Sequence, residues 1–400
     1  MTAPLIQAAE VALGRQRAPQ YETGEHIILY LRSANIGDGH LDLNDVKSMN
    51  FTPAEQTTFS LRAGDVLVTE GSGSRDTVGT SGVWRNELPP PVCFQNTVLR
   101  LRPRPGISDG RYIAWWMRHA HASGLIAAVA TGANILHLGA ENLRRLPIDL
   151  PRLADQQQIA DFLDDQVSRI DQLEVLRRHQ LELLSQRRRE TIRVGVAGAL
   201  HGQGVQTEVP WVPVLGPEAE LRPLARMVTL QRGVDLTADE REHGEYAVVT
   251  SGGPSGFHSR AVVPHSGVVI GRYGSGGSVF WAEGPHWPHN TTLYVRDYKS
   301  NHLRWVFYLM QAYPYDALQA RTAVPGVNRN DMARDLMPWL PPKRQVQAVA
   351  AIDKALASID TLAQQLSRSV TLLNERKRAL ITAAVTGEFD VTTAMGRGVE

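Results

Sequence analysis

The sequence nearly lacks cysteine, the residue that cross-links secreted proteins and builds many zinc sites. Its 400 residues contain one, Cys93, which excludes a disulfide framework or a cysteine-rich zinc site within the chain. No stretch approaches the 18 or so apolar residues of a membrane-spanning helix, and the first residues lack the apolar core of a signal peptide. We therefore expect a cytoplasmic protein that does not contact membranes.

An excess of charge of either sign is also missing. The chain has 42 Lys and Arg residues against 41 Asp and Glu residues, which gives a formal net charge of +1. Contact with nucleic acid would therefore depend on basic residues gathered on one face rather than on bulk positive charge. The apolar fraction of 42% is ordinary for a protein with buried cores.

Motifs for catalysis are absent as well. The chain has no G-x-x-x-x-G-K-[ST] loop for nucleotide hydrolysis and no Asn/Asp-Pro-Pro-aromatic motif, which a DNA methyltransferase would need. His119 with His121, and His286 with His289, could be proposed as metal ligands, but no H-E-x-x-H motif accompanies them. Packing or surface roles fit these histidines better, so we predict a non-catalytic chain without a metal.

The sequence does contain a long heptad pattern near its C-terminal end. From Val349 to Leu373 apolar residues recur at alternating steps of three and four, which is the spacing of a narrow helix-packing seam. No Pro or Gly lies between Pro342 and Gly387, so one helix of about 40 residues is expected. A helix with so narrow an apolar stripe needs a partner helix.

The partner is predicted within the same chain, because residues 151–200 repeat the C-terminal segment at an offset of 189 residues. The match is ungapped and includes Ile170 on Ile359 and the terminal glycines, Gly198 on Gly387. The predicted seam of the two helices consists of Leu163, Val167, Ile170, Leu181, Leu184, Val349, Ile352, Leu356, Ile359, Leu366, Val370 and Leu373.

Two details of the helices need interpretation. Glu174 and Arg177 fall on seam positions of the first helix, so we expect its stripe to shift locally to Leu173 and Leu176 rather than bury charge. The basic triplets 187–189 and 376–378 fit a solvated helix face, with phosphate or a partner protein as the alternative contact.

A β-rich segment precedes each helix. Residues 30–36, 61–71 and 95–103 are expected strands of the first, and 267–281 and 289–297 correspond to the last two of these in the second. The predicted organisation is a mixed α/β domain at 1–150, a helix at 151–200, a linker at 201–220, a second domain at 221–340, a second helix at 341–389 and a tail at 390–400.

These features resemble the specificity (S) subunits of type I restriction-modification systems over nearly the whole chain. The resemblance rests on PRLADQQQIADFLD and PPKRQVQAVAAID where the helices start, on RIDQL and SIDTL, on RRRETIRVGVAGAL and RKRALITAAVTGEF where they end, and on GDVLV, GVVIGRYGSGG, QNT and HNT in the domains. The chain departs from the family at Arg344, since an acidic residue is usual before Gln345, as at Asp155 in the first helix. The first domain also starts without the lead-in that precedes the second.

The resemblance implies an α/β mixed fold in which two long antiparallel coiled-coil helices separate two target-recognition domains, as a pseudo-twofold internal repeat. Each domain would read one half of a bipartite target in double-stranded DNA. Two methyltransferase (modification) subunits would bind the helices, and restriction (translocase) subunits can join them. S-adenosylmethionine and ATP are expected on those partners, with no cofactor on this chain. The gap between half-sites should then depend on helix length.

Other functions remain open on the sequence. A fused restriction-methylation enzyme would share the architecture, a free-standing DNA-binding regulator would bind its site without partners, and a coiled-coil adaptor would show no sequence preference. A neighbouring reading frame with an N-P-P-[FY] motif would favour the S-subunit interpretation.

The candidate DNA-binding residues lie on glycine-rich loops and on the loops that lead back to the helices. Base reading in the major groove uses Arg or Lys for guanine, Asn or Gln for adenine, and hydroxyls for either. Asn96 and Asn290 recur at equivalent places, so we expect a structural role for them. Turn chemistry is the alternative for each candidate: Ser72, Ser74, Arg75, Asn134, His137, Arg272, Tyr273, Ser275, Arg321, Asn328 and Arg329.

Overall fold

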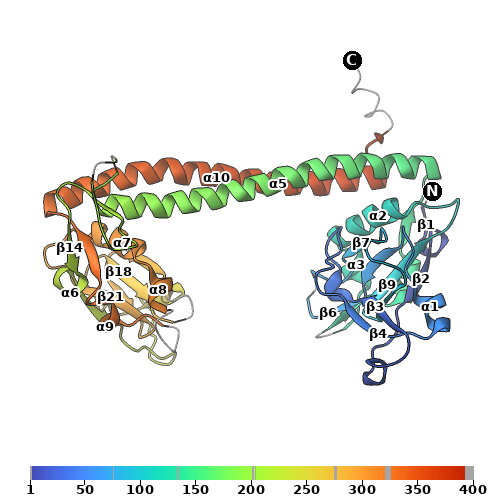
Figure 1. Ribbon diagram of the computed structural model, residues 1–400, viewed down its shortest axis with the longest axis horizontal. Helices are drawn as coiled ribbons and strands as arrows, with labels where there is room; N and C mark the ends of the chain where they lie inside the picture. The colour runs from blue at the N-terminus through green and yellow to red at the C-terminus, as the bar shows by residue number, and fades with distance from the viewer. Residues whose placement is uncertain are drawn as a thin grey trace, which may run out of the picture. The chain divides into compact units, whose positions relative to one another are not determined.

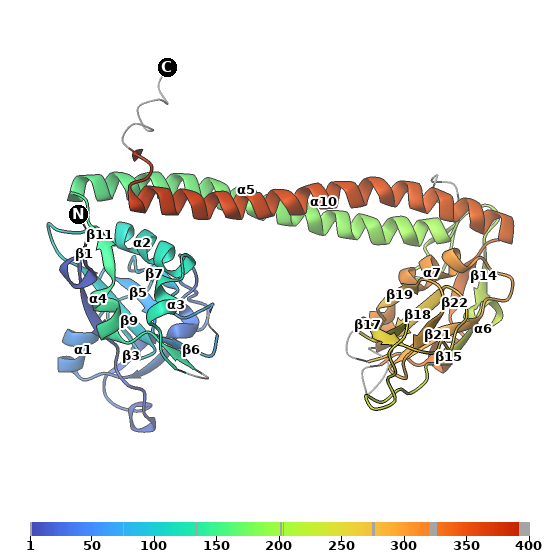
Figure 2. The same cartoon turned by 180° about the vertical axis from the view of Figure 1, so that it is seen from behind.

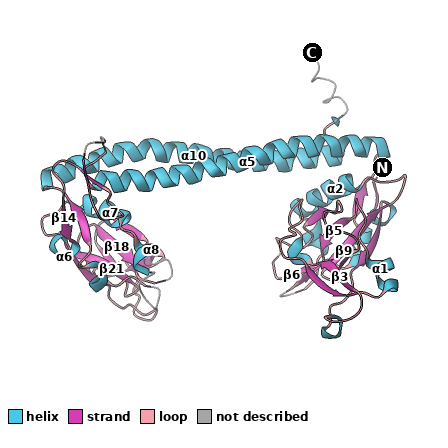
Figure 3. Ribbon diagram, in the orientation of Figure 1, coloured by secondary structure: helices cyan, strands magenta, loops and turns pink. Residues whose placement is uncertain are grey.

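A computed structural model of the chain describes residues 2–74, 76–132, 135–200, 202, 204–273, 277–319 and 326–391. The chain divides into two compact units, Met1–Leu176 with Ser369–Glu400 and Arg177–Arg368. Two long helices, α5 (Leu153–Val196) and α10 (Pro342–Thr386), run side by side in both views (Figures 1 and 2). The strands lie outside these helices (Figure 3), so each unit combines a β-rich domain with part of the helix pair.

The domain of unit 1 contains two main sheets. One is antiparallel with the strand order β2-β9-β5-β7, and the other has the order β4-β3-β8, in which only β3 and β8 are parallel. Their bounds are β2 Ala9–Leu13, β9 Val98–Pro103, β5 Val66–Thr69, β7 Ser81–Val83, β4 Lys47–Asn50, β3 Ile27–Leu31 and β8 Val92–Phe94. The remaining elements are β1 Thr2–Pro4 with β11 Pro147–Asp149, β6 Gly71–Ser72 with β10 Leu136–His137, α1 Pro53–Phe59, α2 Gly110–Ala122, α3 Leu125–Val129, α4 Ala140–Arg145, and the short 3-10 helices η1 Leu5–Gln7, η2 Pro19–Tyr21 and η3 Ser33–Asn35.

The domain of unit 2 has the same two sheets. The strand orders are β15-β21-β18-β19 and β17-β16-β20, again with a single parallel pair, β16 and β20. Their bounds are β15 Thr229–Arg232, β21 Thr292–Asp297, β18 Gly267–Gly271, β19 Val279–Ala282, β17 Gly253–His258, β16 Tyr246–Thr250 and β20 His286–Pro288. The remaining elements are β14 Glu220–Pro223 with β22 Leu336–Trp339, β12 Val205–Gln206 with β13 Val214–Leu215, α6 Leu224–Met227, α7 Leu303–Ala312, α8 Tyr315–Gln319 and α9 Arg329–Met332.

The two domains therefore share one topology, although their sequences differ. The ladder β1–β11 corresponds to β14–β22, so the extreme N-terminus packs as a strand even without the longer lead-in of the second domain. The predicted strands are shorter than expected: 30–36 continues β3 only to Leu31, and 61–71 contains β5 from Val66 to Thr69. In the first case η3 (Ser33–Asn35) ends the extended conformation.

Each domain shares one hydrophobic core with the helices of its unit. In unit 1, Trp116 and Met117 of α2 pack with Leu163 of α5 and Val385 of α10, all at most 3% exposed. In unit 2, a corresponding cluster includes Trp305 and Leu309 of α7, Val196 of α5, and Ile352 and Leu356 of α10. A domain thus cannot separate from its helices without exposing apolar surface, at a cost of about 25 cal/mol per Å².

Within each unit the helices run antiparallel. In unit 1, Phe162 lies against Phe389 and Asp171 lies against Lys377. Residue numbers therefore rise along α5 where they fall along α10. All twelve predicted seam residues are buried or half-buried. Gly198 and Gly387 follow shortly after the helix ends, Val196 and Thr386, and their φ angles of 72° and 75° lie in the left-handed region that glycine adopts without strain at a helix C-terminus.

The predicted shift of the stripe in the first helix is wrong. Leu173 and Leu176 are 45% and 59% exposed, whereas the side chain of Glu174 is only 15% exposed. The ammonium of Lys377 lies 2.8 Å from Asp171 and 3.6 Å from Glu174. A cation from the other helix therefore lets a carboxylate occupy the seam, and the heptad continues without a shift.

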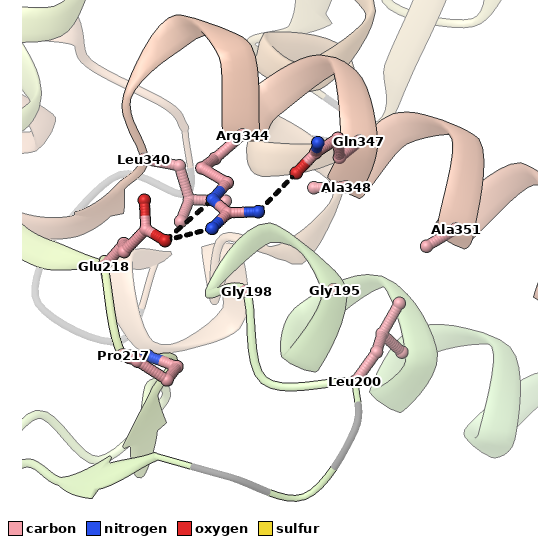
Figure 4. A pocket seen from close by; sticks show the side chains of 10 residues that line it. All are labelled: Gly195, Gly198, Leu200, Pro217, Glu218, Leu340, Arg344, Gln347, Ala348 and Ala351. Carbon is pink, nitrogen blue, oxygen red and sulfur yellow. Dashed lines mark hydrogen bonds and ion pairs between the residues drawn. The ribbon is translucent and has the colours of Figure 1, made fainter.

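The position before the first helical glutamine carries opposite charges in the two helices, and each charge is paired. Asp155 accepts from Arg152 at 2.9 Å, whereas Arg344 donates to Glu218, which precedes β14, at 2.8 Å. Hydrogen bonding from Arg344 holds the pKa of Glu218 below its ordinary value. Figure 4 shows this pair beside a cavity of about 320 Å³, which is bordered by the small residues Gly195, Gly198, Ala348 and Ala351 among others.

Within the ranges given above, none of the helices combines the length and the apolarity that crossing a membrane requires.

Candidate nucleic-acid interface

In unit 1 the loop after β5 and the loop that leads back to α5 meet as a short antiparallel ladder. Ser72 in β6 pairs with Leu136 in β10, and the backbone N–H of Leu138 donates to the carbonyl of Glu70 at 2.7 Å. His137 is brought to the same place, where its Nδ1 lies 3.1 Å from the carboxylate of Glu70. The loop after β5 and the loop that leads back to the helix therefore form one surface.

The serines of this surface take part in turn chemistry. The backbone N–H of Ser74 donates to the hydroxyl of Ser72 at 3.1 Å, and the N–H of Asp76 donates to the hydroxyl of Ser74 at 3.3 Å. Such bonds order a loop locally. Each hydroxyl can still donate to a base, because it also carries a proton.

In unit 2 the equivalent loops also meet. The backbone N–H of Val327 donates to the carbonyl of Arg272 at 2.9 Å. The guanidinium of Arg272 lies 4.7 Å from the ring centre of Tyr273 and donates to its hydroxyl at 3.0 Å. Tyr273 is 46% exposed, so this stacked pair offers a planar donor and a hydroxyl at the surface.

Asn328 and Arg329 follow directly but have different surroundings. The Asn328 side chain caps α9 by accepting from the N–H of Asn330 at 3.0 Å, and it is exposed. Arg329 donates toward the carbonyl of Leu230 at 3.4 Å, which places it over β15. The candidates Arg75, Asn134, Ser275 and Arg321 lie outside the described residues.

The two surfaces rest on one backbone framework. The N–H of Glu70 donates to the carbonyl of Thr97 at 2.9 Å, and the N–H of Arg272 donates to that of Thr291 at 3.0 Å. Strand ends in both domains thus hold a loop pair at the same position of the same topology. The side chains differ, with Glu70, Ser72 and His137 in one domain and Arg272 and Tyr273 in the other.

The QNT and HNT segments have structural contacts. The hydroxyl of Thr97 accepts from the N–H of Ser33 at 3.1 Å, and that of Thr291 accepts from the N–H of Ser251 at 3.2 Å. Asn290 donates to Asp235 at 2.6 Å. These threonines join the two sheets of each domain, which explains why the motif occurs in both.

A basic hollow beside Gln95 was missed by reasoning from the sequence. It has a volume of about 460 Å³ and is bordered by Arg17, Arg32 and Lys47, among other residues. Asp45 pairs with Arg32 and Lys47; hydrogen bonding from Lys47 lowers the pKa of Asp45. Arg32 and Lys47 come together when β3 and β4 pair, and Arg17 comes from the segment before η2, so no spacing in the sequence reveals them.

No three His, Cys, Asp or Glu side chains of the described ranges gather as a metal site would require. The lone thiol of Cys93 is fully buried, and this burial raises its pKa to about 11. The polar groups at the loop pairs can donate and accept hydrogen bonds and carry charge, which is the chemistry of recognition.

Comparison with known proteins agrees with this architecture. A family model described as the type I restriction modification DNA specificity domain matches residues 28–183. The chain is 26% identical over 205 residues to the type I restriction enzyme StySPI specificity subunit of Salmonella potsdam, covering 50% of this chain and 43% of that protein. It is 27% identical over 195 residues to the EcoKI specificity subunit of Escherichia coli K12, covering 48% and 40%. The chain thus matches less than half the length of these curated relatives.

Solved structures agree in fold. A chain from work described as the structural basis of complex assembly and conformational transition of the type I R-M system superposes with a TM-score of 0.74 at 13% identity, covering 96% of this chain and 97% of that one. The HsdS subunit of Thermoanaerobacter tengcongensis gives 0.50 at 14% identity, covering 97% of each chain. The chain is thus similar to type I restriction-modification DNA specificity subunits, in sequence over the residues that the family model and the two curated relatives match.

Proposed function

We propose that this chain reads a bipartite target in double-stranded DNA, one half-site with each domain, as the non-catalytic specificity subunit of a cytoplasmic restriction-modification complex. The observation that carries the proposal is the shared backbone framework of the two loop pairs, on which the side chains differ. A common backbone framework places the loop pairs alike in the two domains, and the different side chains on them select different bases.

The side chains of the loop pairs suit base recognition. The guanidinium of Arg272 can donate to guanine, and the amide of Asn328 can both donate to and accept from adenine. Ser72, Ser74 and His137 offer smaller polar groups in the first domain. The four candidates outside the described residues, Arg75, Asn134, Ser275 and Arg321, belong to the same loops and are proposed with them.

We further propose that methyltransferase subunits, and restriction subunits with them, dock on the long helices. Apolar side chains remain exposed there, and exposed apolar groups on a helix surface are typical of protein interfaces. They are Leu173, Val175, Leu176 and Leu372 in unit 1 and Leu183 and Leu362 in unit 2. S-adenosylmethionine and ATP would be bound by those partners and supply methyl transfer and translocation.

The methylome of a host that carries this chain and its modification partners tests the proposal. We expect one bipartite methylated motif. Exchanging Asn328 for Ser keeps an oxygen that can cap α9 but removes the amide, so we expect relaxed selection at one position of one half-site. A lost bidentate base contact is worth about 1–3 kcal/mol of discrimination.

Asn328→Ala serves as the comparison, since it removes both the amide and the cap. It should relax the same position and also lower the stability of the domain by about 1 kcal/mol. Methylation without any bipartite motif, by a complex shown to be assembled, would contradict the proposed function. Sequence-specific binding by this chain in the absence of partners would favour a free-standing regulator.

A further inference from the structure

Each long helix carries a buried glutamine in its first turn. In unit 1, Gln156 of α5 is fully buried and makes three hydrogen bonds. Its Oε1 accepts from the N–H of Asp109 at 3.0 Å, and its Nε2 donates to the carbonyls of Ile107 and Pro151 at 3.0 and 2.8 Å. Asp109 is the N-cap of α2, so this glutamine joins the start of α2 to the start of α5.

The second unit repeats the arrangement. Gln345 of α10 is also fully buried, and its Oε1 accepts from the N–H of His302, the N-cap of α7, at 2.7 Å. Its Nε2 donates to Oδ1 of Asn301 at 2.7 Å and to the carbonyl of Leu340 at 2.8 Å. Gln156 and Gln345 are equivalent in the 189-residue repeat, as are Pro151 and Leu340.

A second contact lies eight residues further along each long helix. The indole N–H of Trp115 in α2 donates to Asp164 at 2.9 Å, and the hydroxyl of Tyr308 in α7 donates to Asp353. Asp164 and Asp353 are again equivalent in the repeat. The donor is an aromatic side chain in both units, with an indole N–H in one and a phenol hydroxyl in the other, and the acceptor is an aspartate in both.

These two contacts give each domain helix two fixed points on its long helix. Eight residues of α-helix span about 12 Å, so the glutamine and the aspartate hold α2 and α7 at two well-separated places. One contact would act as a pivot, whereas two contacts fix a direction. Figures 1 and 2 show α2 and α7 each lying next to the long helices of its own unit.

We propose that Gln156 with Asp164, and Gln345 with Asp353, are clamps that fix the direction in which each recognition domain projects from the helix pair. They are positioning residues, since they lie on the long helices and not on the loop surfaces. This inference rests on the proposed function. If the domains read half-sites of one DNA, the clamps determine how strictly the complex accepts a single gap between those half-sites.

The test uses the complex of this chain with its modification subunits and duplexes that keep both half-sites but vary the gap. The measured quantity is the methylation rate at a gap one base pair too long or too short, divided by the rate at the correct gap. Tyr308→Phe removes only the hydroxyl that contacts Asp353, whose side chain is exposed, so the variant should fold. Gln345→Met removes all three hydrogen bonds of the other contact.

Tyr298→Phe is the matched control. The hydroxyl of Tyr298 accepts from the N–H of Val268 at 2.9 Å, so this substitution also removes a tyrosine hydrogen bond, but one within the domain. We expect Tyr308→Phe to raise the rate ratio about fivefold, the factor that one net hydrogen bond is worth. Gln345→Met should raise it at least as much, and Tyr298→Phe should leave it unchanged.

An unchanged ratio in folded Tyr308→Phe would overturn the clamp, and so would a rise of the same size in Tyr298→Phe. A variant that slows methylation equally at every gap would also overturn it, because that is the result of a merely structural contact. If Gln345→Met fails to fold, the rate ratio of Tyr308→Phe still tests the proposed clamp. Absence of any bipartite target for the unsubstituted complex is a separate outcome, which overturns the proposed function and this inference with it.

Discussion

At the scale of single residues, the seam of the helix pair contains one ion-pair position that occurs twice. Lys377 pairs with Asp171 in unit 1, and Arg188 pairs with Asp360 in unit 2 at 3.2 Å. These pairs are equivalent in the 189-residue repeat with the helices exchanged. Only Lys377 also lies near a seam carboxylate, Glu174, whose equivalent in the other helix is Ala363.

We predict that Lys377→Met lowers the free energy of unfolding by about 1–3 kcal/mol, because it leaves the sheltered carboxylate of Glu174 beside one fewer cation. Arg188→Met is the control, since its pair is more exposed and such pairs are worth about 0–1 kcal/mol. Urea denaturation of the two variants measures the difference. Equal losses would show that Glu174 does not depend on Lys377.

At the scale of elements, α5 and α10 approach closely where α5 ends. A Cβ added at Gly195 would lie 2.4 Å from Cγ1 of Ile352, and Ile352 is fully buried. Here the glycine is needed for close packing of a side chain from the other helix, not for backbone conformation.

We therefore predict that Gly195→Ala destabilises the protein by about 1–3 kcal/mol through overpacking, in spite of alanine's higher helix propensity. In a background of Ile352→Ala the same change should instead stabilise, because the methyl then enters a vacated space and propensity contributes up to about 1 kcal/mol. Denaturant unfolding of the four proteins gives the coupling energy. Additive effects would rule out the contact.

The helices were predictable from the sequence because their signals are local and repeated. The 3-4 spacing, the starting prolines and the final glycines predict α5 and α10. The predicted shift of the apolar stripe to Leu173 and Leu176 was wrong because the spacing of apolar residues carries no information about Lys377. This cation lies about 200 residues away in the sequence and neutralises Glu174. The strand pairing of the domains is also non-local, so the order of strands was visible but their arrangement in sheets was not.

The candidate site was predictable in part for the same reason. Loops rich in glycine and polar residues are recognisable one by one, and the structure brings them together in each domain. The basic hollow of Arg17, Arg32 and Lys47 and the contact of Trp115 with Asp164 join distant segments. No spacing of residues marks such sites before the fold is known.

At the scale of the whole molecule, we propose that the length of the helix pair sets the gap between half-sites. Duplicating residues 170–176 after Leu176 and residues 362–368 after Arg368 adds one heptad to each helix and keeps the seam, which lengthens the pair by about 10 Å, or roughly 3 base pairs. We predict loss of methylation at the original gap, with any remaining activity at the longer one.

The control is a seven-residue insertion after Gly202, which lengthens the chain between α5 and β12 without lengthening either helix. It should leave the preferred gap unchanged, as measured by methylome sequencing. Methylation at the original gap by the protein with lengthened helices would contradict the idea that the helices act as a spacer.

Because the thiol of Cys93 is buried, the distance between the domains can be measured with dyes attached to introduced cysteines. The pKa of this thiol is raised to about 11 and the residue has no exposed surface, so it should not react with maleimide dyes at neutral pH. Two cysteines introduced at exposed positions, one in each domain, could then be labelled without removing the native one. Fluorescence energy transfer between the dyes would follow the separation of the domains as DNA and partner subunits are added.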